Sequence, residues 1–134
     1  IPLFAAWMRT YNCVFIRRSN IRGARRAIER AAETIRSGIP LLVFPEGTRS
    51  KTGPMRPFKS GSLRIAYLSE ATIVPVTLDG VAGLLEQRGY VHSADVTLTV
   101  HPPLEPAEYS GVPSTHLADR IQKTIRSALA NSPH

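Results

Sequence analysis

The sequence predicts an α/β domain in which a mixed, largely parallel sheet is flanked by helices. Apolar β-prone runs alternate along the chain with segments whose apolar residues recur every three or four positions, as in strands joined by crossover helices. The chain has 134 residues, of which 43% are hydrophobic and 20% charged, a composition and a length that suit one globular core. We therefore expect a single domain over residues 1–134.

The first half is expected to hold two parallel strands with a helix between them. Asn12–Ile16 is a short β-prone run. From Asn20 the apolar residues follow helical spacing, and Gly38 ends this helix. Leu41–Phe44 is a continuous apolar run, which is typical of a central strand buried on both faces.

The second half is expected to contain two helices and two strands. In chain order these elements are Ser62–Leu68, Ile73–Leu78, Val96–Val100 and Ser114–Leu129. Pro75 lies inside the first of these strands, and because proline donates no ladder hydrogen bond, we expect that strand at a sheet edge or a bulge. Alternation of apolar residues with threonine predicts that the Val96–Val100 strand is half-buried.

The charge balance favours anionic partners. Lysine and arginine total 17 against 10 acidic residues, a net charge of +7, which suits nucleic acid, phosphate-bearing metabolites or an acidic lipid surface. The single cysteine allows no internal disulfide. We find no metal-ligand spacing and predict no metal site, and no apolar stretch approaches the roughly 18–20 residues that span a bilayer.

The strongest binding candidates directly follow the Leu41–Phe44 run, where open α/β sheets place their ligands. Glu46 offers an acceptor for hydroxyl groups, and Gly47 lets the backbone approach a ligand closely. Thr48 and Arg49 add donors that suit a phosphate or a carboxylate. A polar surface turn, with Arg49 paired to Glu46, is the alternative.

Two further cationic positions are expected near the same crevice. Arg18 ends the first predicted strand, and Lys59 precedes Ser60–Ser62 at a helix start. Exposed amides at a helix N-terminus, flanked by cations, form a ready anion site, although a solvated charged loop is the alternative. We expect Arg18, Glu46 and Arg49 to converge around one crevice.

Taken in order, these motifs resemble the glycerolipid acyltransferase family, which includes the 1-acyl-sn-glycerol-3-phosphate acyltransferases. The resemblance runs from Ile1 to about Gly80. The segments that resemble successive family blocks are Cys13–Arg18, Phe44–Ser50, Pro57–Gly61 and Ile73–Thr77. The resemblance implies the glycerol-3-phosphate acyltransferase-like fold.

The activity that the resemblance implies is transfer of a fatty acyl group from acyl-CoA or acyl-carrier protein to the free hydroxyl of 1-acylglycerol-3-phosphate, with no cofactor beyond the acyl thioester. It implies that Arg18 and Arg49 hold the acceptor phosphate, that Glu46 helps to bind the glycerol portion, and that Pro75 shapes the pocket. Gly47, Thr48 and Lys59 belong to the same expected binding site. The implied setting is peripheral, on the cytoplasmic side of an anionic membrane, without nucleic acid.

Two departures from the family pattern matter. Arg17 stands where many members have aspartate. The family uses a His-x-x-x-x-Asp pair in which histidine is the general base and aspartate orients it, yet no histidine of this chain has aspartate five positions later. We therefore expect the pair upstream of Ile1, in an N-terminally truncated acyltransferase domain.

Two other functions stay open at this point. One is a catalytically dead lipid-binding scaffold that keeps the pocket. The other is a basic nucleic-acid-binding module, which would be expected to interleave aromatic and basic residues, whereas the arginines here gather in the predicted helix after Asn20 without such aromatics.

Overall fold

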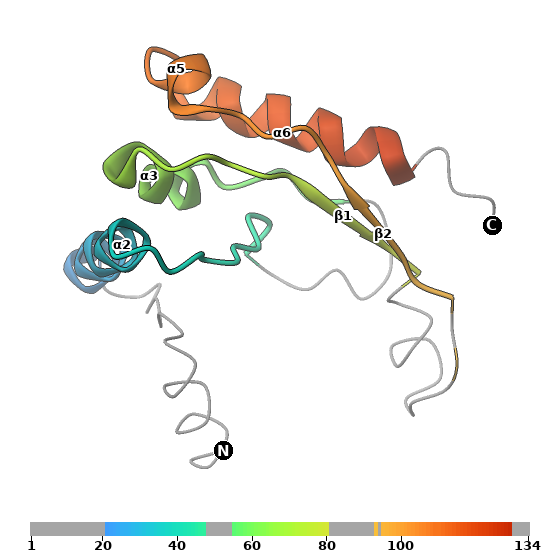
Figure 1. The fold of residues 1–134 in the computed structure, drawn as a ribbon, viewed down its shortest axis with the longest axis horizontal. Coiled ribbons are helices and arrows are strands. Elements are labelled where there is room, and N and C mark those ends of the chain that lie inside the picture. The colour runs from blue at the N-terminus through green and yellow to red at the C-terminus, as the bar shows by residue number, and fades with distance from the viewer. Residues whose placement is uncertain (1–20, 48–54, 81–92, 94, 130–134) are drawn as a thin grey trace.

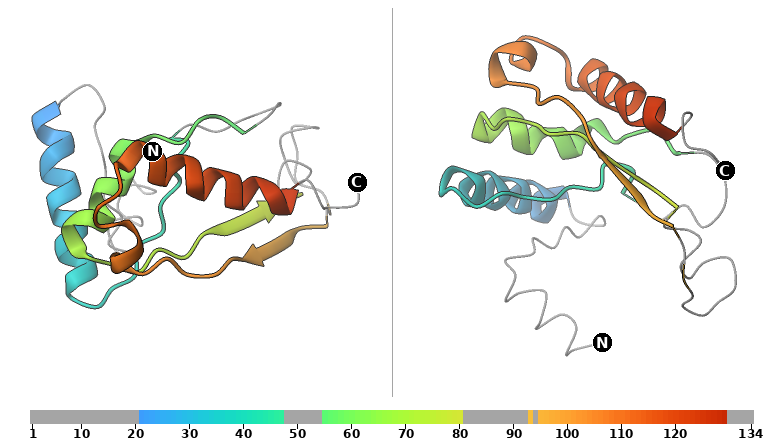
Figure 2. Two further views of the ribbon diagram at one scale, coloured as in Figure 1. Left: turned by 90° about the horizontal axis from the view of Figure 1, so that it is seen from above. Right: turned by 45° about the vertical axis from the view of Figure 1, so that its right-hand side comes forward.

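The fold consists of stacked helices beside a small β-hairpin. The computed structural model describes residues 21–47, 55–80, 93 and 95–129. Their elements are α2 (Ile21–Arg36), α3 (Ser60–Ser69), β1 (Val76–Asp79), β2 (Thr97–Val100), α5 (Pro106–Tyr109) and α6 (Ser114–Leu129). Helices α2, α3 and α6 lie in successive layers, and α6 runs along one side of the hairpin (Figures 1 and 2). The three long helices confirm the predicted ones.

Helix α2 packs on α3 through small side chains. Ala27, Ala31 and Ala32 are fully buried, and their size lets the two helix backbones approach closely. The helix ends in a turn at Gly38, whose φ of 89° favours glycine and whose N–H donates to the carbonyl of Ile35 over 2.9 Å. The predicted C-terminal end of this helix is confirmed.

The core lies between α3, α6 and the segment that joins the hairpin to α6. Its buried members are Leu63, Leu104, Tyr109, Leu117, Ala118 and Ile121. The Tyr109 hydroxyl donates to the carbonyl of Ala71 over 2.6 Å, and its ring meets that of Tyr67 edge to face, with centroids 5.2 Å apart. Burial raises the pKa of both tyrosine hydroxyls. These contacts fix α3 against the C-terminal half.

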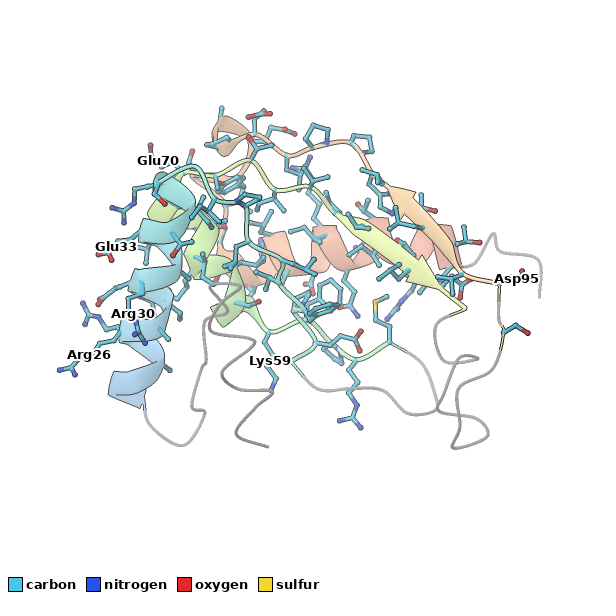
Figure 3. All side chains as sticks on the ribbon, turned by 60° about the horizontal axis from the view of Figure 1, so that its bottom comes forward. Arg26, Arg30, Glu33, Lys59, Glu70 and Asp95 are labelled. Carbon is cyan, nitrogen blue, oxygen red and sulfur yellow. The ribbon has the colours of Figure 1, made fainter. Side chains whose placement is uncertain are left out.

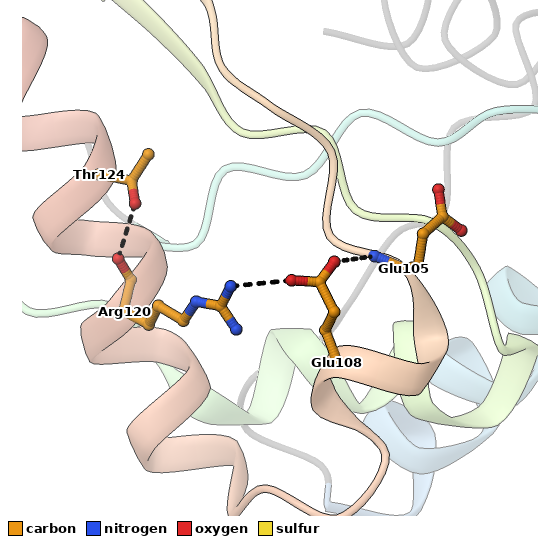
Figure 4. Close-up of polar contacts among 4 residues, drawn as sticks. All are labelled: Glu105, Glu108, Arg120 and Thr124. Atoms are coloured by element: carbon orange, nitrogen blue, oxygen red, sulfur yellow. Dashed lines mark hydrogen bonds and ion pairs between the residues drawn. The ribbon is translucent and has the colours of Figure 1, made fainter.

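The short helix α5 was not predicted, and a capping box builds it (Figure 4). Glu108 accepts a hydrogen bond from the backbone N–H of Glu105 over 2.9 Å and another from Arg120 on α6 over 3.0 Å. The Glu105 amide, followed by the Arg120 guanidinium, lowers the pKa of Glu108. These contacts therefore stabilise the folded protein fully at pH values above the usual carboxyl pKa. The contribution is lost as the pH falls through the lowered pKa of Glu108.

The hairpin is antiparallel and carries a bulge. Its paired residues are Val76 with Val100, Thr77 with Thr99, Leu78 with Leu98 and Asp79 with Thr97. A separate bridge joins Ile73 to Leu104, so that residues 101–103 oppose residues 74–75. Pro75 lies on the shorter side, opposite the extra residue of the bulge, and its carbonyl accepts from the His101 N–H over 3.0 Å. The ladder is irregular at Pro75 as expected, but the bulged strand is its partner and not the strand that contains Pro75.

The two faces of the hairpin differ from the prediction. Thr77, only 2% exposed, faces α6, donates to the carbonyl of Ile125 over 3.0 Å and bonds His101 Nε2 over 2.8 Å. Leu98 and Val100 are 59% and 62% exposed. The apolar face of β2 is therefore exposed, and the face that meets α6 is the one on which Thr77 bonds the carbonyl of Ile125.

The expected central strand at Leu41–Phe44 is not confirmed by the part of the chain that the structure describes. These residues belong to no helix or strand there, and the structure shows no parallel ladder between described residues. Leu42 and Phe44 are 76% and 69% exposed. A strand buried on both faces needs hydrogen-bonded neighbours and covering layers, and the described residues supply neither. The partner expected for it, Asn12–Ile16, lies outside the described residues.

Candidate functional site

The segment Pro45–Gly47 forms a tight turn after the apolar run. The Gly47 N–H donates to the carbonyl of Phe44 over 3.1 Å, which closes a four-residue turn. Pro45 occupies the second position, where its fixed φ suits such a turn, and Gly47 has a φ of 67°, in the left-handed region that favours glycine. The local sequence therefore places Glu46 at the tip of the turn.

Two hydrogen bonds attach this turn to the segment before α3. The Glu46 carboxylate Oε2 accepts from the backbone N–H of Arg56 over 3.1 Å. The carbonyl of Pro45 accepts from the backbone N–H of Lys59 over 2.9 Å. The structure therefore brings the predicted site residues Glu46, Gly47 and Lys59 to one place. A long loop separates Lys59 from the other two in sequence.

Helix α3 begins at this place with features that suit an anion. Its N-cap residue is Lys59, whose side chain makes no capping hydrogen bond, and the first turn contains no acidic residue. The first amides of a helix lack acceptors within that helix and carry its positive dipole end. Lys59 is exposed and extends from the start of α3 (Figure 3). A phosphate group would meet both backbone amides and a cation here.

Helix α6 supplies a further residue that the sequence did not predict. Gln122 Nε2 donates to the carbonyl of Arg56 over 3.1 Å, and Gln122 Oε1 accepts from the N–H of Phe58 over 3.3 Å. The residues that it joins are 64 and 66 positions away in the chain. Spacing gives no signal for such a contact, and the family resemblance ends well before residue 122.

Other predicted residues lie elsewhere. Arg18, Thr48 and Arg49 lie outside the described residues, so the convergence of Arg18 and Arg49 with Glu46 stays a prediction. Pro75 is buried opposite the hairpin bulge, where its carbonyl accepts a hydrogen bond from His101 and not from the Glu46 turn. Its role in shaping a pocket stays a prediction as well.

The described residues hold neither a cluster of metal ligands nor a helix that could cross a membrane. They contain no group of three or more His, Cys, Asp or Glu side chains that would suit a metal ion. None of their helices combines the length and the apolar character that crossing a bilayer requires.

Residues 1–79 match the model of a protein family described as Acyltransferase. This match covers more than half of the 134 residues. The chain belongs to the acyltransferase family. The match ends at residue 79, close to the Gly80 at which the resemblance was expected to end. The resemblance drawn from the motifs is therefore confirmed.

Relatives of this acyltransferase chain carry a more specific name. A probable 1-acyl-sn-glycerol-3-phosphate acyltransferase of Mycoplasma pneumoniae is 32% identical over 131 residues, which cover 92% of this chain and 49% of that protein. A 1-acyl-sn-glycerol-3-phosphate acyltransferase of Borreliella burgdorferi is 30% identical, with 93% of this chain and 50% of the relative covered.

A solved structure extends the likeness to the fold. The crystal structure of the 1-acyl-sn-glycerophosphate (LPA) acyltransferase PlsC from Thermotoga maritima matches with a TM-score of 0.79 and 30% identity, over 100% of this chain and 54% of that one. The acyltransferase chain thus spans about half the length of the proteins that it matches.

Proposed function

We propose that the protein containing this chain transfers a fatty acyl group from acyl-CoA or acyl-carrier protein to the free hydroxyl of 1-acylglycerol-3-phosphate, and that this chain supplies the acceptor-binding part. The observation that carries the proposal is the attachment of the Glu46 turn to the start of α3, through Arg56 and Lys59. The names of the relatives and of the structural neighbour support the same reaction.

The acceptor is expected to lie between the turn and the helix start. Its phosphate meets Lys59 and the first amides of α3, which carry no competing carboxylate in that turn. One oxygen of Glu46 is engaged by the Arg56 amide, and the other is proposed to accept from a glycerol hydroxyl. Arg18 and Arg49 are proposed as further phosphate ligands on the ground of the family motifs, with Gly47 and Thr48 beside them.

The proposed reaction moves the acyl group from the sulfur of the thioester to the hydroxyl oxygen of the acceptor. The acceptor oxygen attacks the thioester carbonyl while a general base takes the hydroxyl proton, and a C–O bond forms. The C–S bond then breaks, and the leaving thiolate takes up that proton and departs as the thiol. Glu46, Lys59 and the first amides of α3 are proposed to bind and orient the acceptor, which contributes through proximity, and none of these described groups is proposed as the general base. No cofactor other than the acyl thioester is part of the proposal.

We also propose a peripheral setting at the cytoplasmic side of an anionic membrane, with the outer face of α2 as one contact. Arg26 and Arg30 are exposed and extend from α2 into solvent (Figure 3). Neighbouring cations one helical turn apart attract anionic headgroups within about one Debye length, roughly 8–10 Å at moderate salt.

Reversing these charges is expected to weaken vesicle binding. The double variant Arg26→Glu/Arg30→Glu should bind vesicles containing phosphatidylglycerol less well than wild type in a co-sedimentation assay, and added salt should weaken the wild type too. The control Lys123→Glu/Arg126→Glu changes the net charge equally on α6. Equal binding of wild type to neutral and anionic vesicles at low salt would contradict the proposal, and tighter binding to single-stranded DNA would favour a nucleic-acid module.

The proposed reaction itself is tested with the full-length protein and a radiolabelled acyl-CoA or acyl-carrier protein. Expected is transfer to 1-acylglycerol-3-phosphate and much weaker transfer to 1-monoacylglycerol, which lacks the phosphate. Equal transfer to both acceptors, or transfer to neither, would overturn the proposal.

A further inference from the structure

The segment Met55–Lys59 carries two cations beside the Glu46 turn, on backbone that has no regular secondary structure. Arg56 and Lys59 are both exposed. A side chain on irregular backbone holds a ligand well only if that backbone is fixed from outside. How this segment is fixed therefore decides whether the cations meet the acceptor phosphate in one geometry or in many.

Gln122 supplies much of that fixation. Its side-chain amide donates to the carbonyl of Arg56 and accepts from the N–H of Phe58, at 3.1 Å and 3.3 Å. Because a backbone N–H can only donate and a carbonyl can only accept, these partners also determine which end of the amide is oxygen. The side-chain amide thus supplies one donor and one acceptor to residues two positions apart. A single residue of a neighbouring strand would supply the same pair through its N–H and its C=O.

The helix that carries Gln122 is itself anchored on both sides of it. Leu117 and Ile121 are buried in the core, and the carbonyl of Ile125 accepts from the Thr77 hydroxyl over 3.0 Å. Phe58 packs against the same core. The anchoring of the segment therefore comes from a region beyond residue 79, where the match to the family ends.

We propose that Gln122 is a positioning residue for the acceptor phosphate, which holds Met55–Lys59 on α6 so that Lys59 and Arg56 face the phosphate together with the Glu46 turn. The inference rests on the proposed acyl transfer and adds to it. The reacting atoms are not touched by Gln122, so its removal should weaken acceptor binding while it leaves the chemical step and donor binding intact.

The test is the steady-state kinetics of the full-length protein with Gln122→Met, which keeps the length of the side chain but neither hydrogen bond. The KM for 1-acylglycerol-3-phosphate is expected to rise about tenfold, the order expected from losing paired hydrogen bonds. The KM for the acyl donor and kcat should stay within about twofold of wild type. Lys123→Met, on the next position of the same helix, is the matched control.

Hydrogen exchange adds a readout of the segment itself. In Gln122→Met the amides of residues 56 and 58 should exchange faster, while amides of α6 keep their protection. Gln122→Glu is a second variant that keeps the acceptor but lacks the donor for the Arg56 carbonyl, and its acceptor KM should rise too.

The outcomes separate the two proposals. No transfer by the wild-type protein would overturn the proposed function. Transfer by the wild type with an unchanged acceptor KM in both Gln122 variants would overturn the positioning role alone. A lower kcat with both KM values unchanged and faster exchange throughout α6 would also overturn it, since Gln122 would then serve general stability.

Discussion

The 134-residue chain on its own is expected to give no acyl transfer from acyl-CoA to 1-acylglycerol-3-phosphate above background. A hydroxyl is a poor nucleophile at neutral pH, and a positioned general base contributes on the order of 10²–10⁴-fold in rate. None of the four histidines is followed by aspartate at the fifth position. Glu46 and Lys59 are proposed to orient the acceptor, and neither of them is proposed to accept its proton.

The measurement compares this chain with a longer protein in which a His-x-x-x-x-Asp segment precedes residue 1, at equal concentration and with the same acyl donor. Only the longer protein is expected to catalyse acyl transfer. Replacing the histidine of its His-x-x-x-x-Asp segment by alanine should abolish that activity. Robust acyl transfer by the 134-residue chain alone would refute the prediction that it needs a general base from outside this sequence. A full-length sequence without such a pair, and without activity, would favour the catalytically dead scaffold.

Replacement of Glu46 by alanine in the full-length protein is expected to lower kcat/KM for the acceptor by about 10²-fold. The carboxylate accepts from the Arg56 amide over 3.1 Å, and its free oxygen is proposed to bind the glycerol portion. Alanine removes both contacts. The side chain lies on a surface turn, half-buried, so the circular dichroism spectrum should keep its shape.

Glu46→Gln separates the two contacts. Its amide oxygen still accepts from Arg56 while the negative charge is gone, so its activity should lie between those of wild type and Glu46→Ala. Arg49→Ala, by resemblance to the family, should also reduce activity severely. Asp119→Ala, an exposed acid on α6, should have little effect. Wild-type activity in both Glu46→Ala and Arg49→Ala would refute the assignment of the site.

Local patterns were sufficient to predict the three long helices α2, α3 and α6. Apolar spacing with Gly38 as the stop predicted α2, and the range Ser114–Leu129 coincides with α6. These signals are carried by neighbours within one or two turns. Even the missed helix α5 has such a signal, since Pro106 at its first turn and the Glu105–Glu108 capping box can be read in the sequence.

The environment of each element was harder to predict, because it depends on distant residues. The apolar run at Leu41–Phe44 predicted a doubly buried strand, but no described neighbour pairs with it. The alternation in β2 predicted which side chains share a face, yet Thr77 and its bond to Ile125 decided which face meets α6. Period-2 patterns define faces and leave their orientation to tertiary contacts.

The candidate site shows the same division. The motif around Glu46 and Gly47 predicted a turn at the candidate site, and Lys59 was predicted at the helix start that the structure confirms. Hydrogen bonds from the backbone amides of Arg56 and Lys59 join them, and a glutamine on α6 holds the same segment. Neither has a sequence signature, because backbone partners are independent of residue type and Gln122 lies 64 residues from Phe58.

The start of α3 is proposed to recognise the phosphate of the acceptor, and the acceptor preference of Lys59→Met tests this proposal. The ratio of kcat/KM for 1-acylglycerol-3-phosphate to that for 1-monoacylglycerol is measured in the full-length protein, with Lys123→Met as the control. We expect Lys59→Met to lower this ratio by about tenfold, the equivalent of roughly 1.4 kcal/mol, by weakening transfer to the phosphorylated acceptor alone. An unchanged ratio in Lys59→Met would contradict it.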